Sequence, residues 1–420
     1  MAPVEITPVL TRAERDAFIG FPWEIYRDDP AWVPPLRLER KEFLDRKKHP
    51  FYEHGDACLF LARRAGKIVG RIMASDDPNY NAEHDSNVGC FGLFEAIDDQ
   101  EVASALLGAA ADWLRARGRV QIMGPIDYST NYVCALLIEG FQHPPTLLTP
   151  HNPSYYAALI EGAGFRKEMD WYAWWFDQPD DARRRLQRIS KRFANSLDVK
   201  IRAVKMKDLA GESRRLREIY NRAWEKNWGF VPFTTAEFDH LIKELKPLAE
   251  PEYTLIAEVG DQPVGFLLYL PDINVALRHL PDGRLFTRGV PIGLAKLLYY
   301  KSRLKTGRLV ALGVVPEFRR HGVAEKLVLR ILEEAMIKNG VTGAGSLILE
   351  NNRLMNHFLE AIGADRHKTY RIYNRPIVAA SRSPLPSFAN AFPRSRNEIV
   401  FARKVTMSRG QPTLCARRPV

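Results

Sequence analysis

The chain has 420 residues, of which 46% are hydrophobic and 26% are charged, and its net charge is +11. These proportions exclude fibrous, collagen-like and wholly disordered chains, and the length predicts two to three domains at roughly 100–200 residues each. No apolar run approaches the roughly 20 residues that span a bilayer. The four cysteines show no paired or metal-like spacing. We therefore expect a soluble, cytoplasmic protein that binds no metal.

Two parts of the chain resemble each other, block by block and in the same order. Residues 61–74 resemble residues 256–269, and residues 151–165 resemble residues 350–364. Between these blocks each part has one long amphipathic segment that predicts a helix ending at a glycine, and the last predicted strand of each part is aromatic. Changes in the spacing indicate insertions within 119–147 and 272–305. The chain is therefore predicted to contain an internal duplication.

The duplication predicts an α/β (α+β) fold of two domains in tandem, each a mixed, mostly antiparallel twisted sheet flanked by helices. The expected divisions, read from the repeat and from composition, are an N-terminal domain over 1–178, a basic connecting helix over 179–196, a C-terminal domain over 197–378 and a basic tail over 379–420. The tail is rich in Pro, Ser and Arg, which predicts disorder.

Positive charge is concentrated in two segments. Residues 183–207 contain ten Lys or Arg and one acidic residue, and residues 379–420 contain eight Lys or Arg and one acidic residue. The rest of the chain is mildly acidic, so we expect no nucleic-acid partner. An anionic inner-membrane surface is a possible partner of such segments. The alternative is a solvated helix face and a tail.

The strongest chemical signal is a predicted phosphate loop in the second part. The β-rich run 309–315 is followed by Arg319-Arg320-His321-Gly322-Val323-Ala324 and then by a long amphipathic helix. Gly322 and the small Ala324 let the backbone approach a ligand. The helix start offers unpaired N–H groups to a pyrophosphate, and Arg319 and Arg320 add positive charge. The alternative is an ordinary solvated helix start.

The first part lacks this loop. Asp98, Asp99 and Glu101 occupy the positions where arginines and a glycine are needed. Carboxylates there repel an anion, so a nucleotide cofactor is expected to bind to the second part only. The first part is then expected to serve as a scaffold and as a wall of the acceptor site.

The pattern Arg-x-x-Gly-x-Ala at 319–324, followed by SLILENNRLMNHFLEAIGA, resembles the acetyl-CoA signature of the GNAT acyltransferase superfamily. The segments GPIDYSTNYVCALLIEGF, PHNPSYY, NWGFVPF and ENNRLMN are similar to a tandem-GNAT group that includes bacterial ceramide synthases. The similarity runs from about Glu5 to Ile377. It implies an acyl-CoA co-substrate, an amine acceptor that attacks the thioester directly, and no metal. In ceramide synthases the acceptor is a sphingoid long-chain base.

The resemblance also implies roles for individual residues. The expected acyl-CoA contacts are Leu312, Gly313, Val314, Arg319, Arg320, His321, Gly322, Val323, Ala324, Asn352 and Asn356. The backbone N–H of Gly313 or Val314 is expected to hold the thioester oxygen. The expected acceptor contacts are Trp224, Asn227, Trp228, Asn274, Asn131, His151, Asn152 and Tyr156.

A base is needed for the ammonium group of the acceptor. Asp272 is the first choice and Glu350 the second, although an Asx turn or a helix cap explains each of them equally well. The general-acid tyrosine of single-domain GNAT enzymes is replaced by Leu359. Tyr155, or its neighbour Tyr156, is the expected substitute as proton donor, unless both are ordinary core and cap aromatics.

Other functions stay open at this point. The apolar stretch 289–305 is studded with basic residues, which suits a membrane interface, the roof of a lipid tunnel or a plain packed helix. Alternatives to a lipid N-acyltransferase are an acetyltransferase acting on a small-molecule or peptide amine, an aminoacyl-tRNA-dependent transferase, and a non-catalytic scaffold that binds CoA or a membrane. The intact Arg-x-x-Gly-x-Ala loop argues against the tRNA-dependent enzyme.

Overall fold

The computed structural model of the chain describes residues 2–191 and 197–377. The predicted tail at 379–420 and the last part of the predicted connecting helix, 192–196, lie outside the described residues. Helices and strands alternate in both halves, and a helix, α7, covers Pro179–Ser190 at the junction.

In the first half the elements are β1 (Val4–Pro8), α1 (Arg12–Gly20), α2 (Pro22–Ile25), α3 (Arg37–Phe43), η1 (Pro50–Glu53), β2 (Asp56–Arg64), β3 (Lys67–Asp76), α4 (Pro78–Glu83), β4 (Val88–Ala96), α5 (Gln100–Arg115), β5 (Gln121–Gly124), β6 (Leu136–Glu139), α6 (Tyr156–Gly162) and β7 (Arg166–Phe176).

In the second half they are β8 (Val199–Ala203), η3 (Met206–Asp208), α8 (Leu209–Trp224), α9 (Thr235–Leu245), η4 (Pro251–Tyr253), β9 (Thr254–Val259), β10 (Gln262–Pro271), α10 (Asn274–Leu277), α11 (Ile292–Lys301), β11 (Thr306–Val314), η5 (Pro316–Phe318), α12 (Val323–Ile331), the π-helical η6 (Leu332–Lys338), β12 (Thr342–Leu349), α13 (Arg353–Ala361) and β13 (Asp365–Pro376).

The long predicted helices form where their sequences favour them. In α5 and α12 the buried residues recur with helical spacing. Gly118 follows α5 and Gly340 follows η6, with φ angles of 79° and 63°. These are left-handed conformations that glycine adopts at little cost, which explains why each helical segment ends there.

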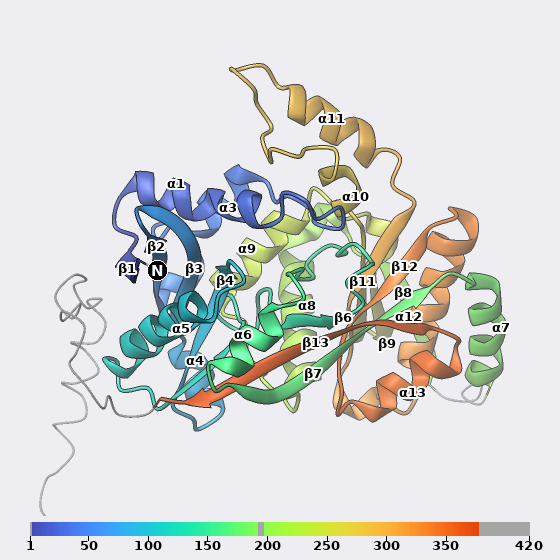
Figure 1. Ribbon diagram of the computed structural model, residues 1–420. Helices are drawn as coiled ribbons and strands as arrows, with labels where there is room; N and C mark the ends of the chain where they lie inside the picture. The colour runs from blue at the N-terminus through green and yellow to red at the C-terminus, as the bar shows by residue number, and fades with distance from the viewer. Residues whose placement is uncertain (1, 192–196, 378–420) are drawn as a thin grey trace, which may run out of the picture. The chain divides into compact units, whose positions relative to one another are not determined.

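The strands of the two halves join in one sheet (Figure 1), in the order β1-β2-β3-β4-β5-β13-β7-β12-β11-β10-β9-β8, with β6 beside β13. The last strand of each half is exchanged. Strand β7 pairs with β12, and β13 pairs with β5. The two exchanged strands also pair with each other, antiparallel, and so join the halves.

The predicted fold class is confirmed: the sheet is mixed, helices flank it, and each half repeats the same order of strands. The domain boundary at residue 178 stays a prediction. Strand β7 precedes this boundary in the sequence but lies beside β12 of the second half in the sheet. The largest apolar cluster surrounds α12 and includes side chains of α7, β7 and β10. This core supports the open part of the sheet described next.

Candidate functional site

A cleft opens between the parallel strands β11 and β12. They pair only where Thr306–Leu309 faces Thr342–Gly345. Beyond this point β11 stays paired with β10 as far as Val314, and β12 pairs with β7 as far as Leu349. The two strands therefore diverge, and the space between them has a volume of about 830 Å³, including its opening to solvent.

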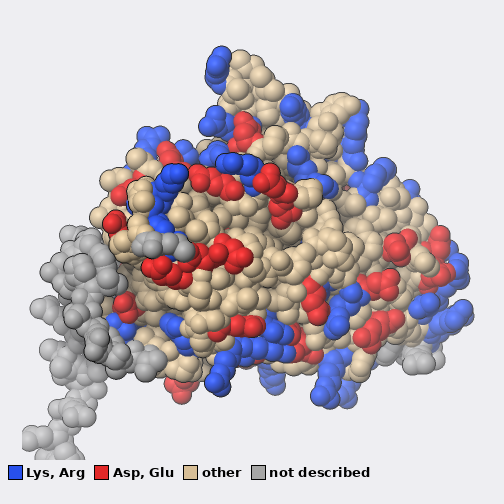
Figure 2. Space-filling view, in the orientation of Figure 1, with Lys and Arg blue, Asp and Glu red and all other residues tan. Residues whose placement is uncertain are grey.

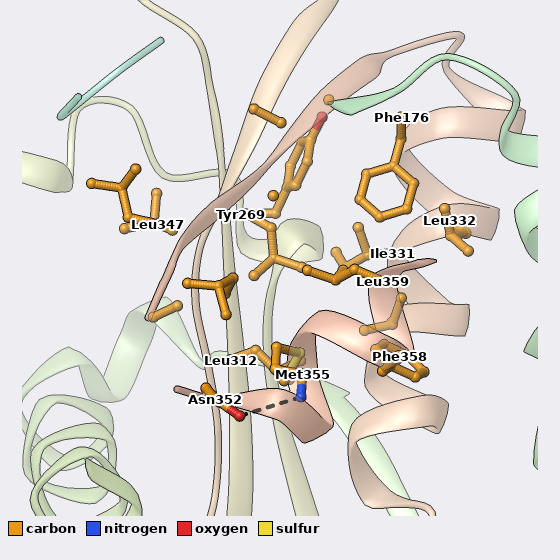
Figure 3. A pocket seen from close by; sticks show the side chains of 18 of the residues that line it. Phe176, Tyr269, Leu312, Ile331, Leu332, Leu347, Asn352, Met355, Phe358 and Leu359 are labelled. Atoms are coloured by element: carbon orange, nitrogen blue, oxygen red, sulfur yellow. Dashed lines mark hydrogen bonds between the residues drawn. The ribbon is translucent and has the colours of Figure 1, made fainter. Parts of the chain in front are cut away.

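The walls of this cleft are almost entirely apolar (Figure 3). They come from β11 and β12, from the facing sides of α12, η6 and α13, and from single residues of neighbouring strands. Leu312 and Asn352 lie at one end of the view, and Tyr269 and Phe176 lie at the other. Leu359, which replaces the tyrosine of single-domain relatives, is one of the lining residues. An elongated apolar group fits such a space better than a charged one.

The helix that borders the cleft begins without a side-chain cap. Gly322 is the N-cap of α12 and has a φ of 74°. Because glycine has no side-chain acceptor, the N-cap residue makes no side-chain hydrogen bond to the first turn of the helix. The first N–H groups of a helix and its dipole attract an anion. Arg320 is exposed beside this start. The arrangement is therefore suited to a diphosphate.

Two side chains modify this picture. The guanidinium of Arg319 donates to the carbonyl oxygens of Val314 (3.2 Å) and Ala223 (2.6 Å), so it ties α8 to the end of β11 as well as adding charge. The carboxyl group of Glu325, in the first turn of α12, is partly buried, and this burial raises its pKa. When it is ionised, this carboxyl group opposes the binding of an anion at the same helix start.

A second space, of about 530 Å³, adjoins the cleft. The two share Trp224, Leu347, Ile348 and Asn352 as lining residues. Four of the predicted acceptor contacts lie together on its walls, namely Asn131, Trp224, Asn227 and Trp228. Gly313 has room for no side chain, because a Cβ atom would lie 2.2 Å from the ring of Trp224. The indole thus rests directly on β11, between the two spaces.

Sequence reasoning missed two other residues of this second space, Trp171 and Tyr220. Trp171 belongs to the aromatic strand that was interpreted only as a strand. Tyr220 stacks on Trp224 at 4.6 Å between ring centroids. Within the described residues, the buried Nε1 of Trp171 and the buried Nδ2 of Asn131 have no hydrogen-bond partner. Both atoms are hydrogen-bond donors.

Asp272, the first-choice base, is not among the lining residues of either space. Its Oδ1 accepts the N–H groups of Leu147 (2.9 Å) and Asn274 (3.2 Å), and burial raises its pKa to about 6. Asn274 donates to the carbonyl oxygen of Pro145 at 3.0 Å. Both side chains hold the loop at 143–147, which comes from the first half.

Two buried cations hold the same loop, and sequence reasoning did not anticipate them. Lys368 Nζ donates to the carbonyl oxygens of His143 (2.7 Å) and Pro144 (3.1 Å), and burial lowers its pKa to about 8. Arg308 donates to the carbonyl oxygen of Leu147. In the sequence both look like the exposed positions of a strand, which is why no local pattern revealed them.

The remaining candidates with catalytic or pantetheine roles have structural partners. Glu350 accepts the N–H of Asp170 (3.1 Å) and pairs with Lys167 (2.7 Å). Asn356 accepts from the indole of Trp174 (3.3 Å) and donates to the backbone. Asn352 lines both spaces, and its Oδ1 accepts the N–H of Met355 at 3.2 Å, so it caps α13 (Figure 3).

Four predicted site residues of the first half, at positions 151, 152, 155 and 156, are not among the lining residues of either space. The hydroxyl of Tyr155 donates to the carbonyl oxygen of Ala96 (2.9 Å), and that of Tyr156 donates to Glu95 (2.7 Å). His151 bonds to Asp29 at 2.7 Å, and Asn152 accepts the N–H of Leu137 at 2.7 Å. The structure thus brings together the predicted phosphate loop, the cleft and the tryptophan-lined space, but not these four residues.

The described residues lack two further kinds of feature. Neither 2–191 nor 197–377 contains a group of three His, Cys, Asp or Glu side chains that suits a metal ion. In the same ranges no helix combines the length and the apolar character that a membrane crossing requires.

Comparisons with known proteins agree with this geometry. The model of the acetyltransferase (GNAT) family matches residues 213–364. Protein YghO of Escherichia coli (strain K12) is 39% identical over 379 residues, which cover 88% of this chain and 94% of that protein. Bacterial ceramide synthase of Caulobacter vibrioides (strain NA1000 / CB15N) is 35% identical over 383 residues, which cover 90% and 98%.

Among solved structures, a tandem GNAT protein from the clavulanic acid biosynthesis pathway aligns with a TM-score of 0.53 at 12% identity. The alignment covers 90% of this chain and 100% of that one. At this identity the likeness concerns the fold alone, and it extends over both halves.

Proposed function

The chain belongs to the GNAT family of acyltransferases, and on this premise we propose that it transfers a fatty acyl group from acyl-CoA to the amine of a sphingoid long-chain base, forming a (dihydro)ceramide. The GNAT family uses acyl-CoA as co-substrate. A relative covered over 98% of its length is named as a bacterial ceramide synthase. The observation that carries the proposal is the uncapped start of α12 beside an apolar cleft.

In this proposal the N–H groups of Val323 and Ala324 hold the diphosphate, with Arg320 adding charge. The pantetheine arm and the acyl chain lie along the cleft, and Asn352 stands where the two spaces meet. The amine enters from the tryptophan-lined space. Its nitrogen forms a bond to the thioester carbon, the carbon–sulfur bond breaks, and the nitrogen loses a proton while the thiolate gains one.

The surroundings suggest how the amine becomes a nucleophile. Among the described lining residues of the two spaces there is no carboxylate, histidine or lysine. Apolar surroundings disfavour an ammonium ion and lower its pKa, so we propose that desolvation delivers the neutral amine. Asp272 and Glu350 then act through the fold rather than on the proton.

The acceptor's chemistry follows from the second space. Its indole rings offer apolar contact to a long alkyl chain, and the free N–H groups of Asn131 and Trp171 suit the oxygens that flank the amine of a sphingoid base. A small acetyl acceptor would leave much of the apolar wall uncovered. The reaction is proposed to take place at the cytoplasmic face of an anionic inner membrane, where such a lipid resides.

The direct test is incubation of the full chain with C16-CoA and either sphinganine or 3-ketosphinganine, followed by mass spectrometry of the lipid extract. We expect one amide product and stoichiometric release of CoA. The matched pair of variants is Arg320→Glu, expected to lose most activity, and Arg330→Glu, which makes the same charge change on the exposed far end of α12. The proposed substrate is wrong if neither base is acylated while acetyl-CoA and a small amine react.

Recognition of the acceptor's oxygens has its own test. Octadecylamine has the same alkyl chain as sphinganine but no hydroxyl groups. We expect Asn131→Leu and Trp171→Phe to raise the KM for sphinganine roughly tenfold, since a lost hydrogen bond in a dry site costs about 1–2 kcal/mol, and to leave the KM for octadecylamine unchanged. An equal rise for both amines would show that the substitutions only disturb packing.

A further inference from the structure

The second-half insertion carries an apolar helix that the rest of the molecule does not cover. In Figure 1, α11 and the loop before it project away from the sheet. Within α11 only Gly293 is buried. Phe286, Val290, Ile292, Leu298 and Tyr299 are each between 48% and 57% exposed. Scattered apolar residues on a surface are ordinary, whereas a cluster of five on one projection indicates an interaction site.

The same projection is strongly basic. Residues 281–305 contain six Lys or Arg and a single acidic residue, Asp282. Figure 2 shows Lys and Arg side chains around the tan tip at the top of the view. The apolar residues and the cations are thus interleaved. This composition is that of a segment that lies in the interface of an anionic bilayer.

The base of the projection is fixed to the first half. The indole of Trp23 donates to the carbonyl oxygen of Pro281 at 2.7 Å, and Arg37 donates to the carbonyl oxygens of Asp282 and Gly283, both at 2.9 Å. At the other end the ring of Tyr300 stacks on His279 with centroids 3.6 Å apart. The exposed side chains are therefore presented by an anchored element.

We infer that residues 284–303 form a membrane-docking element that inserts its apolar side chains into the surface of a bilayer rich in anionic phospholipid. The cations identify the occupant. A second copy of this chain would bring five further cations against the five of residues 284–303, and like charges in an apolar interface repel each other strongly. Anionic headgroups neutralise them while Phe286, Ile292 and Leu298 enter the acyl boundary. Docking explains how a lipid acceptor reaches the enzyme, but the contact itself does not depend on acyl transfer.

The test is flotation of the full chain with vesicles of phosphatidylglycerol and phosphatidylcholine, compared with vesicles of phosphatidylcholine alone. We expect the wild type to bind to the anionic vesicles. Binding should be at least tenfold weaker for two double variants, Ile292→Ser/Leu298→Ser and Arg288→Glu/Lys296→Glu. The matched controls are Leu10→Ser/Val120→Ser and Lys67→Glu/Lys200→Glu, which change exposed residues elsewhere in the same way and should bind as the wild type does. All variants keep the basic segment 379–420.

Each other outcome overturns the inference. Unchanged binding of both α11 variants would assign membrane contact to another part of the chain. A wild-type protein that ignores anionic vesicles would exclude docking, and concentration-dependent self-association abolished by Ile292→Ser/Leu298→Ser would identify a second copy as the occupant. CoA release with C16-CoA and sphinganine in detergent micelles is measured alongside. It is expected to be unchanged in the α11 variants, so a failure of docking is separated from a failure of the proposed reaction.

Discussion

The corresponding helices of the two halves, α5 and α12, begin in opposite ways. In the first half Asp99 caps α5: its carboxylate accepts the N–H groups of Glu101 (2.9 Å) and Val102 (3.2 Å), and it pairs with Arg64 at 2.6 Å. The hydrogen bond from Arg64 lowers the pKa of Asp99. In the second half Gly322 leaves the equivalent N–H groups of α12 without a side-chain cap. One helix start carries its own anion, and the other is free to accept one from a ligand.

The strands beside these helices differ in the same sense. Beyond the last paired residues of β4 and β5, Cys90 and Met123, the N–H of Ile126 donates to the carbonyl oxygen of Phe91 at 2.6 Å, and Asp127 accepts the N–H of Leu93 at 2.9 Å. In the first half these contacts lie at the position that corresponds to the divergence of β11 and β12 in the second half. If the proposed function holds, these short polar contacts close the first-half position that corresponds to the proposed cofactor site.

The largest expected effect comes from giving α12 the cap of α5. Gly322→Asp is expected to weaken CoA binding about 100-fold, because a carboxylate at the N-cap competes with the diphosphate. Gly322→Asn is the control, since it has the same size and the same left-handed backbone requirement but no charge. Isothermal titration with CoA measures both. Unchanged CoA binding by Gly322→Asp would mean that the uncapped start does not hold the diphosphate.

A second comparison concerns Asp77 and Asp272, which follow the third strand of each half at the spacing of 195 residues shared by the first repeated block. Each is buried and accepts the N–H of an asparagine two residues later, Asn79 at 2.9 Å and Asn274 at 3.2 Å. Each has a pKa raised by burial to about 6. The first half, whose helix start is capped by Asp99, has an aspartate at the same position. This favours a structural role for Asp272 over a catalytic one.

Asp272→Asn separates these two roles. An amide oxygen accepts the same two N–H groups, so we expect kcat to change less than threefold at pH 8 under this structural role. If Asp272 were the catalytic base, kcat of the variant would fall by several orders of magnitude. The remaining kcat would no longer depend on pH. Steady-state rates of CoA release across pH 6–9 distinguish these outcomes.

The same substitution changes how stability depends on pH. The folded protein keeps a proton on Asp272 up to about pH 6, whereas an unfolded chain loses it near pH 4. Between these values the folded state binds more protons, so the contribution of Asp272 to the free energy of unfolding falls as pH rises. Asp272→Asn removes this fall. Relative to the wild type it should gain on the order of 2 kcal/mol from pH 4 to pH 6 in urea unfolding.

The sequence was informative wherever one local segment decides the structure. The helix start at Gly322 and the long helices ending at Gly118 and Gly340 could be predicted, because each depends on neighbouring residues. The exchange of β7 and β13 could not, since both strands suit either sheet position. Lys368 and Arg308 look exposed by alternation and are buried only because a loop from the other half covers them.

The smallest expected effect tests which difference excludes the cofactor from the first half. Asp99→Ala removes the cap of α5 and should cost about 1 kcal/mol of stability, as should Thr11→Ala, which removes a cap from α1. If the closed strands exclude the cofactor, Asp99→Ala still binds one CoA per chain, because Phe91 and Ile126 remain hydrogen bonded. A second CoA in the titration would show that the helix start alone decides, and that a single carboxylate separates the two halves in function.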